Sequence, residues 1–266
     1  MIPGLLRFKT SFFTQYAGGD FRVFGFLNEI DAYYDNFYYY SNHESISGHA
    51  VKLNILGDMI ALIANDDDIV IFVDGDAFPV APLAKYYDLL DQHSLIAIQR
   101  LENFGDIQPH PCFAMMKVRT WKQYDWDWKR GYKWENSQGR LISDVGGNML
   151  KVVVEQSINW LPLVRTNKNE LHPLWFGVYD NTVYHHGAAF RNKICRLDIQ
   201  ELRTKHPLYH ALETMVDKVV PKPYRAVIKS CLPYRRQLER TSGENSLRIY
   251  NKIRNGEDFL SELDSW

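Results

Sequence analysis

The chain has 266 residues, of which 45% are apolar and 24% are charged. This composition supports a substantial hydrophobic core and excludes an intrinsically disordered protein. The formal net charge of -1 gives no overall attraction to phosphate backbones, so the sequence predicts no nucleic-acid partner. Three widely spaced cysteines, Cys112, Cys195 and Cys231, argue against a disulfide framework or a zinc site and favour a reducing compartment.

The N-terminal residues carry no recognisable targeting signal. Residues 1–9 include a short apolar stretch that is too interrupted for the core of a signal peptide. The sequence also lacks a run of the roughly 18 to 20 apolar residues that would cross a bilayer. These features predict a cytoplasmic protein, with peripheral membrane contact as an open alternative.

The first seventy residues alternate predicted helices and strands. A strand is predicted over 5–13 and a helix over 21–34, followed by an aromatic extended stretch over 36–41. Residues 48–64 have an apolar face at helical spacing and are predicted to be a helix. Residues 69–73, Ile-Val-Ile-Phe-Val, form a continuous apolar run typical of a central parallel strand covered on both faces. The order of a helix followed by a buried strand indicates an α/β fold.

The second half of the chain changes character along its length. Three further strands are predicted, over residues 95–99, 113–118 and 178–186. Beyond about residue 200, Lys and Arg alternate with apolar residues and the pattern is helical. We therefore predict an α/β catalytic domain over residues 1–203 and a helical C-terminal appendage over residues 204–266.

Two aspartates, Asp74 and Asp76, directly follow the apolar strand and are separated by Gly75. In open α/β sheets, ligands bind beyond the carboxyl ends of the strands. Magnesium and manganese prefer oxygen ligands and are often completed by substrate phosphates and water. The pattern predicts a site for Mn²⁺ or Mg²⁺ with a diphosphate; the alternative is a pair of solvated turn carboxylates. The acidic run 66–68 lies at the other end of the strand, where it ends the preceding helix.

Together with two later motifs, this DxD motif resembles that of the GT-A nucleotide-sugar glycosyltransferases. The motifs are Asp74-Gly75-Asp76, Asp144-Val145-Gly146-Gly147 and Tyr184-His185-His186-Gly187. The resemblance covers roughly residues 1–200 and implies a Rossmann-like domain with a mostly parallel central sheet. It also implies a nucleotide-diphosphate sugar as donor, a glycan or lipid-linked hydroxyl as acceptor, and a late histidine as a metal ligand. The histidine loop departs from the family's best-known spacing.

The two adjacent histidines have different expected roles. Neighbouring residues on a strand point to opposite faces, so at most one of His185 and His186 is expected to reach the cation. Which of the two binds the metal stays open, and two ordinary loop histidines are the alternative.

Asp144 is the predicted catalytic residue. An inverting transferase needs a carboxylate that takes the proton from the acceptor hydroxyl, and the two glycines after Asp144 allow a close approach. In a retaining enzyme the same side chain would only orient the acceptor. The alternative is an aspartate that caps a helix beginning near Gly146.

Further donor contacts are predicted for Lys52, Arg191, Thr10 and Ser11. Arg191 has the forked guanidinium that binds diphosphates in a bidentate way, and Lys52 lies on the helix before the DxD strand. An acceptor platform is predicted from aromatic residues, with core packing as the alternative for Trp121, Trp126, Trp128, Tyr132 and Trp134. His110 is assigned either to the same cleft or to a loop.

Two other classes of protein stay open. A haloacid-dehalogenase-like phosphatase also has an apolar strand followed by DxD, with the first aspartate as nucleophile and the second as acid/base. A carbohydrate- or nucleotide-binding module without activity is the non-enzymatic alternative. The basic, apolar segment 219–240 suits either an anionic membrane or packing on the catalytic domain or in a homodimer.

Overall fold

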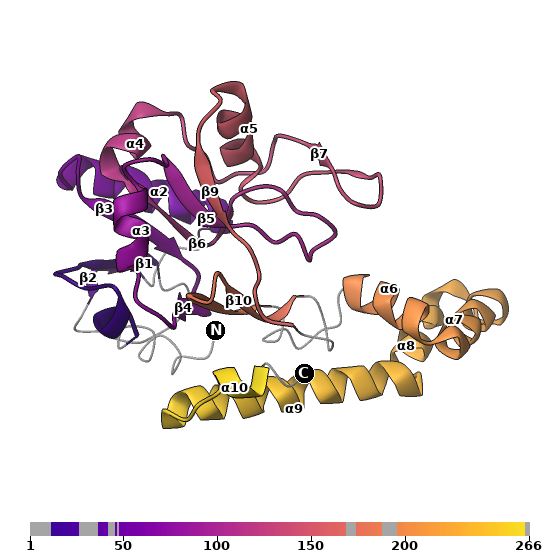
Figure 1. Cartoon of the computed structure of the whole chain (residues 1–266). Coiled ribbons are helices and arrows are strands. Elements are labelled where there is room, and N and C mark those ends of the chain that lie inside the picture. The colour runs from indigo at the N-terminus through magenta and orange to yellow at the C-terminus, as the bar shows by residue number, and fades with distance from the viewer. Residues whose placement is uncertain are drawn as a thin grey trace. The chain divides into compact units, whose positions relative to one another are not determined.

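The computed structural model describes residues 12–26, 37–41, 46, 48–168, 174–187 and 196–263. The chain divides into two compact units (Figure 1). The first unit comprises Met1–Lys168 and Phe176–His186, and the second comprises Asn169–Trp175 and Gly187–Trp266. The domain boundary predicted after residue 203 falls inside helix α6, Arg196–Lys205.

The largest sheet of the first unit has four strands in the order β3-β6-β5-β9. These strands are β3 (Ile69–Val73), β6 (His110–Lys117), β5 (Leu95–Ile98) and β9 (Trp160–Leu163). Strand β6 is antiparallel to both β3 and β5, whereas β5 and β9 are parallel. Three strands therefore run in one direction, and a reversed strand lies between two of them.

Three smaller sheets complete the described strands. The first is the parallel pair of β1 (Val23–Phe26) and β2 (Phe37–Ser41). The second has three strands in the order β10 (Trp175–Tyr179), β11 (Val183–Gly187) and β4 (Ala77–Pro79). The third is the pair of β7 (Trp134–Glu135) and β8 (Leu141–Ile142). The prediction of a Rossmann-like, GT-A domain with a mostly parallel central sheet is therefore wrong. A continuous apolar run shows that a strand is covered on both faces, but it does not fix the direction of the neighbouring strand.

Both faces of the main sheet are buried, because alternate side chains of β3 join two different clusters. Val70 and Phe72 pack with residues of α2 (His49–Ile63), α4 (Val118–Gln123) and α5 (Gly147–Glu155). The other side chains of β3 pack on the opposite face with residues that include Leu83 and Tyr86, from the start of α3 (Ala84–Leu89). This two-sided cover explains why the strand reads as an uninterrupted apolar run.

The tryptophans predicted to form an acceptor platform belong to the core instead. Trp121, Trp126, Trp128 and Trp134 are all buried. A side chain at Gly57 of α2 would place its Cβ 2.4 Å from the ring of Trp121, so only glycine leaves room for this ring. Their large apolar area drives them inside, where their faces are unavailable to a sugar.

Two N-terminal predictions are corrected as well. Residues 12–16 are helical, although 5–13 were predicted to form a strand, and residues 5–11 lie outside the described residues. Strand β1 occupies part of the helix predicted over 21–34. Phe and Tyr side chains fit both periods in so short a segment, and tertiary pairing decides between them.

The described residues 196–263 of the second unit form five helices with short connections. Its helices are α6 (Arg196–Lys205), α7 (Pro207–Val219), α8 (Lys222–Ser230), α9 (Pro233–Asn255) and α10 (Leu260–Leu263). Proline occupies one of the first two positions of α7, α8 and α9, where its missing N–H costs no hydrogen bond. Within the described part of the chain, every helix is too short or too polar to cross a membrane.

Candidate metal site

Asp74 and Asp76 occupy the tight connection between β3 and β4. The backbone N–H of Asp74 donates to the carbonyl oxygen of Cys112 on β6, at 3.1 Å. The N–H of Ala77 donates in turn to the carbonyl oxygen of Asp74, at 3.2 Å, which closes a turn around Gly75. Both carboxylates thus leave the sheet at the end of β3, where the sequence predicts them.

Pairing of β4 with β11 brings a distant histidine to this turn. The two strands are antiparallel, with Ala77 opposite His185, and the N–H of His186 donates to the carbonyl oxygen of Asp76 at 2.9 Å. His185 Nε2 lies 3.4 Å from Asp76 Oδ1. The register of the small sheet therefore determines which histidine reaches the carboxylates.

Asp74, Asp76 and His185 each offer one ligand atom, and these atoms all lie within 4.8 Å of one another. Ligands of one Mg²⁺ ion at about 2.1 Å lie at most about 4.2 Å apart, so small side-chain rotations would bring the three atoms to one cation. Two carboxylates and an imidazole suit Mn²⁺ better than Mg²⁺, which prefers oxygen ligands. The aspartates are partly exposed and the histidine is buried, which leaves the carboxylate side open for further ligands.

His49, the first residue of α2, lies against the first aspartate. Its Nε2 is 2.7 Å from Asp74 Oδ1, a hydrogen-bonding distance. Burial lowers the pKa of His49, but the hydrogen bond to Asp74 and the charge of this carboxylate outweigh it and raise the pKa above its usual value. His49 therefore orients the Asp74 carboxylate.

Buried groups surround the ring of His185. Burial lowers its pKa, while the neighbouring Cys112 and Asp76 raise it, with a net pKa well above the usual value. Burial also raises the pKa of the Cys112 thiol and keeps it neutral, so Asp76 is the partner that raises the pKa of His185, and a cation that binds Nε2 would displace the proton there. His110, at the start of β6, has its ring 6.2 Å from that of His185 and a pKa far below the usual value because it is buried and faces Arg100.

His186 has a different role from its neighbour. It is fully buried, its Nδ1 is 2.8 Å from the hydroxyl of Tyr184, and its ring meets that of Phe176 edge-on at 5.0 Å. Burial lowers its pKa to about 3, so it is neutral at physiological pH. The structure thus brings His185, and not His186, to the two aspartates.

Asp144 lies outside this cluster of three ligands, in the turn before α5. Its Oδ1 accepts from the N–H of Val145 at 2.9 Å and lies 3.1 Å from a guanidinium nitrogen of Arg130. The residue that caps α5 is Gly146, whose φ of 87° favours glycine. The Asp144 side chain is 37% exposed, so a solute can reach the carboxylate.

The predicted donor contacts are only partly described. Lys52 lies in the first turn of α2, which begins at His49. Its charge lowers the pKa of His49, so the two side chains are close to each other. Arg191, Thr10 and Ser11 lie outside the described residues.

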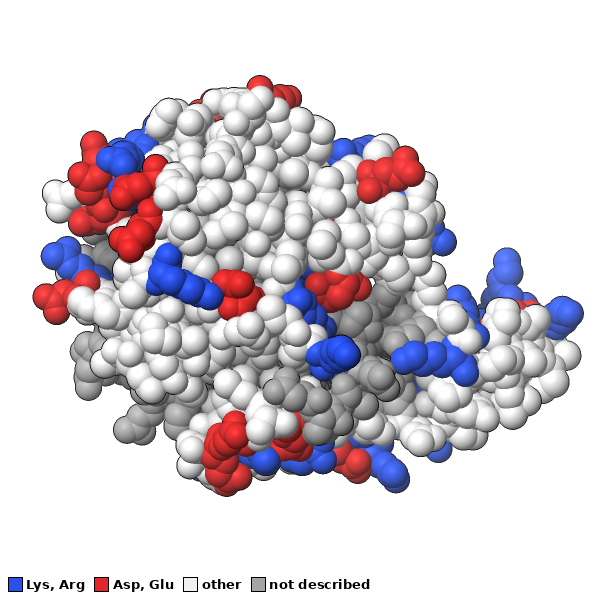
Figure 2. Space-filling view, viewed as in Figure 1, with Lys and Arg blue, Asp and Glu red and all other residues white. Residues whose placement is uncertain are grey.

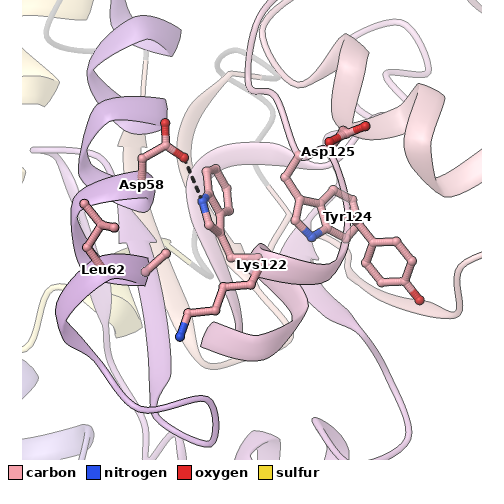
Figure 3. Close-up of a pocket in the computed structure, with 8 residues that line it drawn as sticks. Asp58, Leu62, Lys122, Tyr124 and Asp125 are labelled. Atoms are coloured by element: carbon pink, nitrogen blue, oxygen red, sulfur yellow. Dashed lines mark hydrogen bonds between the residues drawn. The ribbon is translucent and has the colours of Figure 1, made fainter.

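A separate cavity of about 410 Å³ lies between α2 and the segment that begins with α4 (Figure 3). Asp58, Leu62, Lys122, Tyr124 and Asp125 line it together with Trp121 and Trp126. Asp58 accepts from Trp121 Nε1 at 3.1 Å, and Trp126 Nε1 donates to the backbone. The cavity contains none of the metal-site residues, so it is a different place on the first unit.

Sequence reasoning missed His49 and Cys112. Neither residue belongs to a motif, and only the packing of α2 and β6 against the DxD turn brings them to the site. A histidine at the start of the helix before a DxD strand was the one available signal, and it was weak.

Comparisons of this chain with protein families, with curated proteins and with solved structures found no match.

Proposed function

We propose that the chain is a metal-dependent glycosyltransferase that moves a sugar from a nucleotide-diphosphate sugar to a glycan or lipid-linked hydroxyl acceptor. The observation that carries this proposal is the cluster of Asp74, Asp76 and His185 ligand atoms within 4.8 Å at the end of a buried strand. The strand end provides an open edge where a diphosphate can complete the coordination of a cation.

The proposed reaction exchanges one bond at the anomeric carbon of the donor sugar. An acceptor hydroxyl oxygen forms a bond to this carbon, and the bond between the carbon and the diphosphate oxygen breaks. The electron pair leaves with the nucleoside diphosphate, and the hydroxyl proton passes to a carboxylate base. A Mn²⁺ or Mg²⁺ ion, when bound, supplies positive charge that stabilises the diphosphate leaving group.

The residues of the chain have separate tasks in this reaction. Asp74, Asp76 and His185 are the proposed ligands of the cation, and His49 holds the Asp74 carboxylate in one orientation. Asp144 is the proposed base, and Arg130 holds its carboxylate in place through the contact at 3.1 Å. A cytoplasmic location is part of the same proposal, and the free thiols of Cys112 and Cys231 fit a reducing compartment.

Calorimetric titration with UDP, GDP and TDP, each with and without Mn²⁺, tests the proposal. One nucleotide is expected to bind more tightly when Mn²⁺ is present, and Asp74→Asn or Asp76→Asn is expected to abolish this enhancement. Asp67→Asn is the matched control, because Asp67 is an exposed aspartate at the opposite end of β3. Equal nucleotide affinity with and without the metal would refute the metal-dependent reaction.

A second assay separates the rival classes. A screen of nucleotide sugars should detect metal-dependent release of nucleoside diphosphate from one donor. Release of phosphate from simple phosphomonoesters, with no turnover of any nucleotide sugar, would instead identify a phosphatase that uses Asp74 as its nucleophile. Nucleotide or sugar binding with no turnover would identify a binding module.

A further inference from the structure

The helical unit has apolar side chains that face solvent on two consecutive helices. In α7, Leu208, Met215 and Val219 recur at helical spacing and are exposed, with Val219 at 70%. The buried face of the same helix is formed by other residues, Tyr209, Glu213 and Val216. The core of the unit therefore does not account for the exposed stripe.

Helix α8 has the same property in a stronger form. Tyr224, Val227 and Ile228 lie at positions i, i+3 and i+4, on one face, and all three are exposed, with Val227 at 64%. Not one residue of α8 is buried. We call the exposed apolar residues of the two helices, together with Lys218 and Lys222 at their junction, the α7–α8 surface. Exposed apolar residues that recur along one face of a helix mark an interaction site.

The charge of this region is opposite to that of the rest of the chain. Residues 207–236 contain six Lys and Arg but only two acidic residues, whereas the whole chain has a net charge of -1. Figure 2 shows blue side chains on a mostly white surface in the region of α7 and α8. A basic patch around apolar side chains is complementary to an anionic, partly apolar surface.

The two acidic residues pair with Arg203, Arg225 and Lys229, and not with Lys218 or Lys222. Glu213 is buried and pairs with Arg203 at 2.6 Å, and Asp217 pairs with Lys229 at 2.7 Å. Among the residues that the structure describes, no acidic side chain pairs with Lys218 or Lys222. Within the described part of the chain, two lysines at the junction of the helices thus lie beside the exposed apolar side chains without an acidic partner.

We infer that the α7–α8 surface binds the anionic headgroups of a lipid bilayer, with Val219, Tyr224 and Val227 entering the interface between headgroups and acyl chains. Short amphipathic helices with Lys and Arg beside apolar residues bind in this way. The breaks between these helices allow each to lie along the bilayer surface, and none of them has to cross it. This inference is independent of the proposed reaction.

Co-sedimentation of the full chain with vesicles tests the inference. The chain is expected to bind vesicles of phosphatidylcholine with phosphatidylglycerol, and not vesicles of phosphatidylcholine alone. Replacing both lysines, Lys218→Gln with Lys222→Gln, is expected to weaken binding roughly 25-fold, because each cation near an anionic surface contributes about fivefold. Added salt should weaken binding of the native chain as well, because it screens the surface charge.

Matched variants separate the surface from general effects of charge and apolarity. Lys133→Gln with Arg140→Gln removes two exposed cations of the first unit and is expected to leave lipid binding unchanged. Val227→Asn is expected to weaken binding, whereas Leu141→Asn, at a residue with a similar exposure of 67% in the first unit, is not. Circular dichroism of each variant verifies that the fold is kept.

Three results would overturn the inference. They are equal binding to neutral and anionic vesicles, no binding to either, and undiminished binding of the double lysine variant. Sedimentation velocity identifies the principal rival: a dimer that Val227→Asn dissociates, with no lipid binding by the native chain, would assign the α7–α8 surface to a second copy of this chain.

Discussion

His49 Nε2 lies 2.7 Å from Asp74 Oδ1, which joins the start of helix α2 to the turn that follows strand β3. A carboxylate held by such a donor keeps one orientation and needs less ordering when it binds a cation. The contact is side chain to side chain, so substitution removes it without a change in the backbone hydrogen bonds.

We predict that His49→Ala raises the Mn²⁺ concentration needed for half-maximal nucleotide binding by about tenfold. Loss of a side chain that orients a metal ligand typically costs about 10- to 100-fold in metal affinity. Titration of nucleotide binding against Mn²⁺ measures the change. His210→Ala, at an exposed histidine of α7, is the control. An unchanged Mn²⁺ requirement in His49→Ala would show that this contact has no part in metal binding.

Alanine substitutions of the two adjacent histidines should have different main effects, one on metal binding and the other on stability. His185→Ala removes a proposed ligand, so its main effect should be a raised Mn²⁺ requirement, besides the loss of stability that follows from removing a buried ring. His186→Ala removes a buried ring and a partner of the Tyr184 hydroxyl, and it should lower the free energy of unfolding by about 2 kcal/mol or more. Urea unfolding and Mn²⁺ titration of both variants measure the two effects. Similar metal and stability changes in both variants would contradict the separate roles.

Asp144→Asn should lower turnover by about 10²- to 10⁴-fold and leave the affinity for the donor nucleotide nearly unchanged. A general base contributes to the rate of proton transfer and little to ground-state binding. Arg130→Gln is the companion variant, because it removes the ion pair at 3.1 Å and keeps the carboxylate. A large loss of nucleotide affinity in Asp144→Asn would assign this carboxylate to the donor side instead.

Asp180 makes stability depend on pH in the acid range. Its Oδ2 accepts from Lys85 Nζ at 2.7 Å and from the Tyr86 hydroxyl at 2.6 Å. Burial raises the pKa of Asp180, but these two hydrogen bonds outweigh it and lower the pKa below the usual value. The contribution to stability is therefore present above the pKa of the unfolded chain, about 3.9, and is lost as the pH falls through the lower folded value.

Asp180→Asn is expected to destabilise the protein at pH 7, and the difference from the native chain should shrink toward pH 3. Because the side chain is 46% exposed, we expect less than about 1 kcal/mol at pH 7. Asparagine tolerates the positive φ of 48° at this position, so the variant isolates the charge. Urea unfolding at both pH values measures the effect, and an equal difference at both would contradict it.

Local patterns in the sequence determined several elements of this protein. Helical periodicity predicted the helix His49–Ile63 and the helical C-terminal residues, and a continuous apolar run predicted the strand Ile69–Val73. The DxD turn followed because aspartates and glycine directly after a buried strand must leave the sheet together. These features depend on residues that are close together in the chain, where side-chain period and backbone preference suffice.

Tertiary structure alone decided the direction of β6, which made the predicted parallel sheet wrong, and the burial of the tryptophans. It also decided that His185 rather than His186 meets the aspartates, through the register of β11 on β4. A one-residue change of register would exchange the faces of the two histidines. Strand direction, register and the meeting of His49 with Asp74 depend on contacts between segments far apart in the chain, which no local pattern specifies.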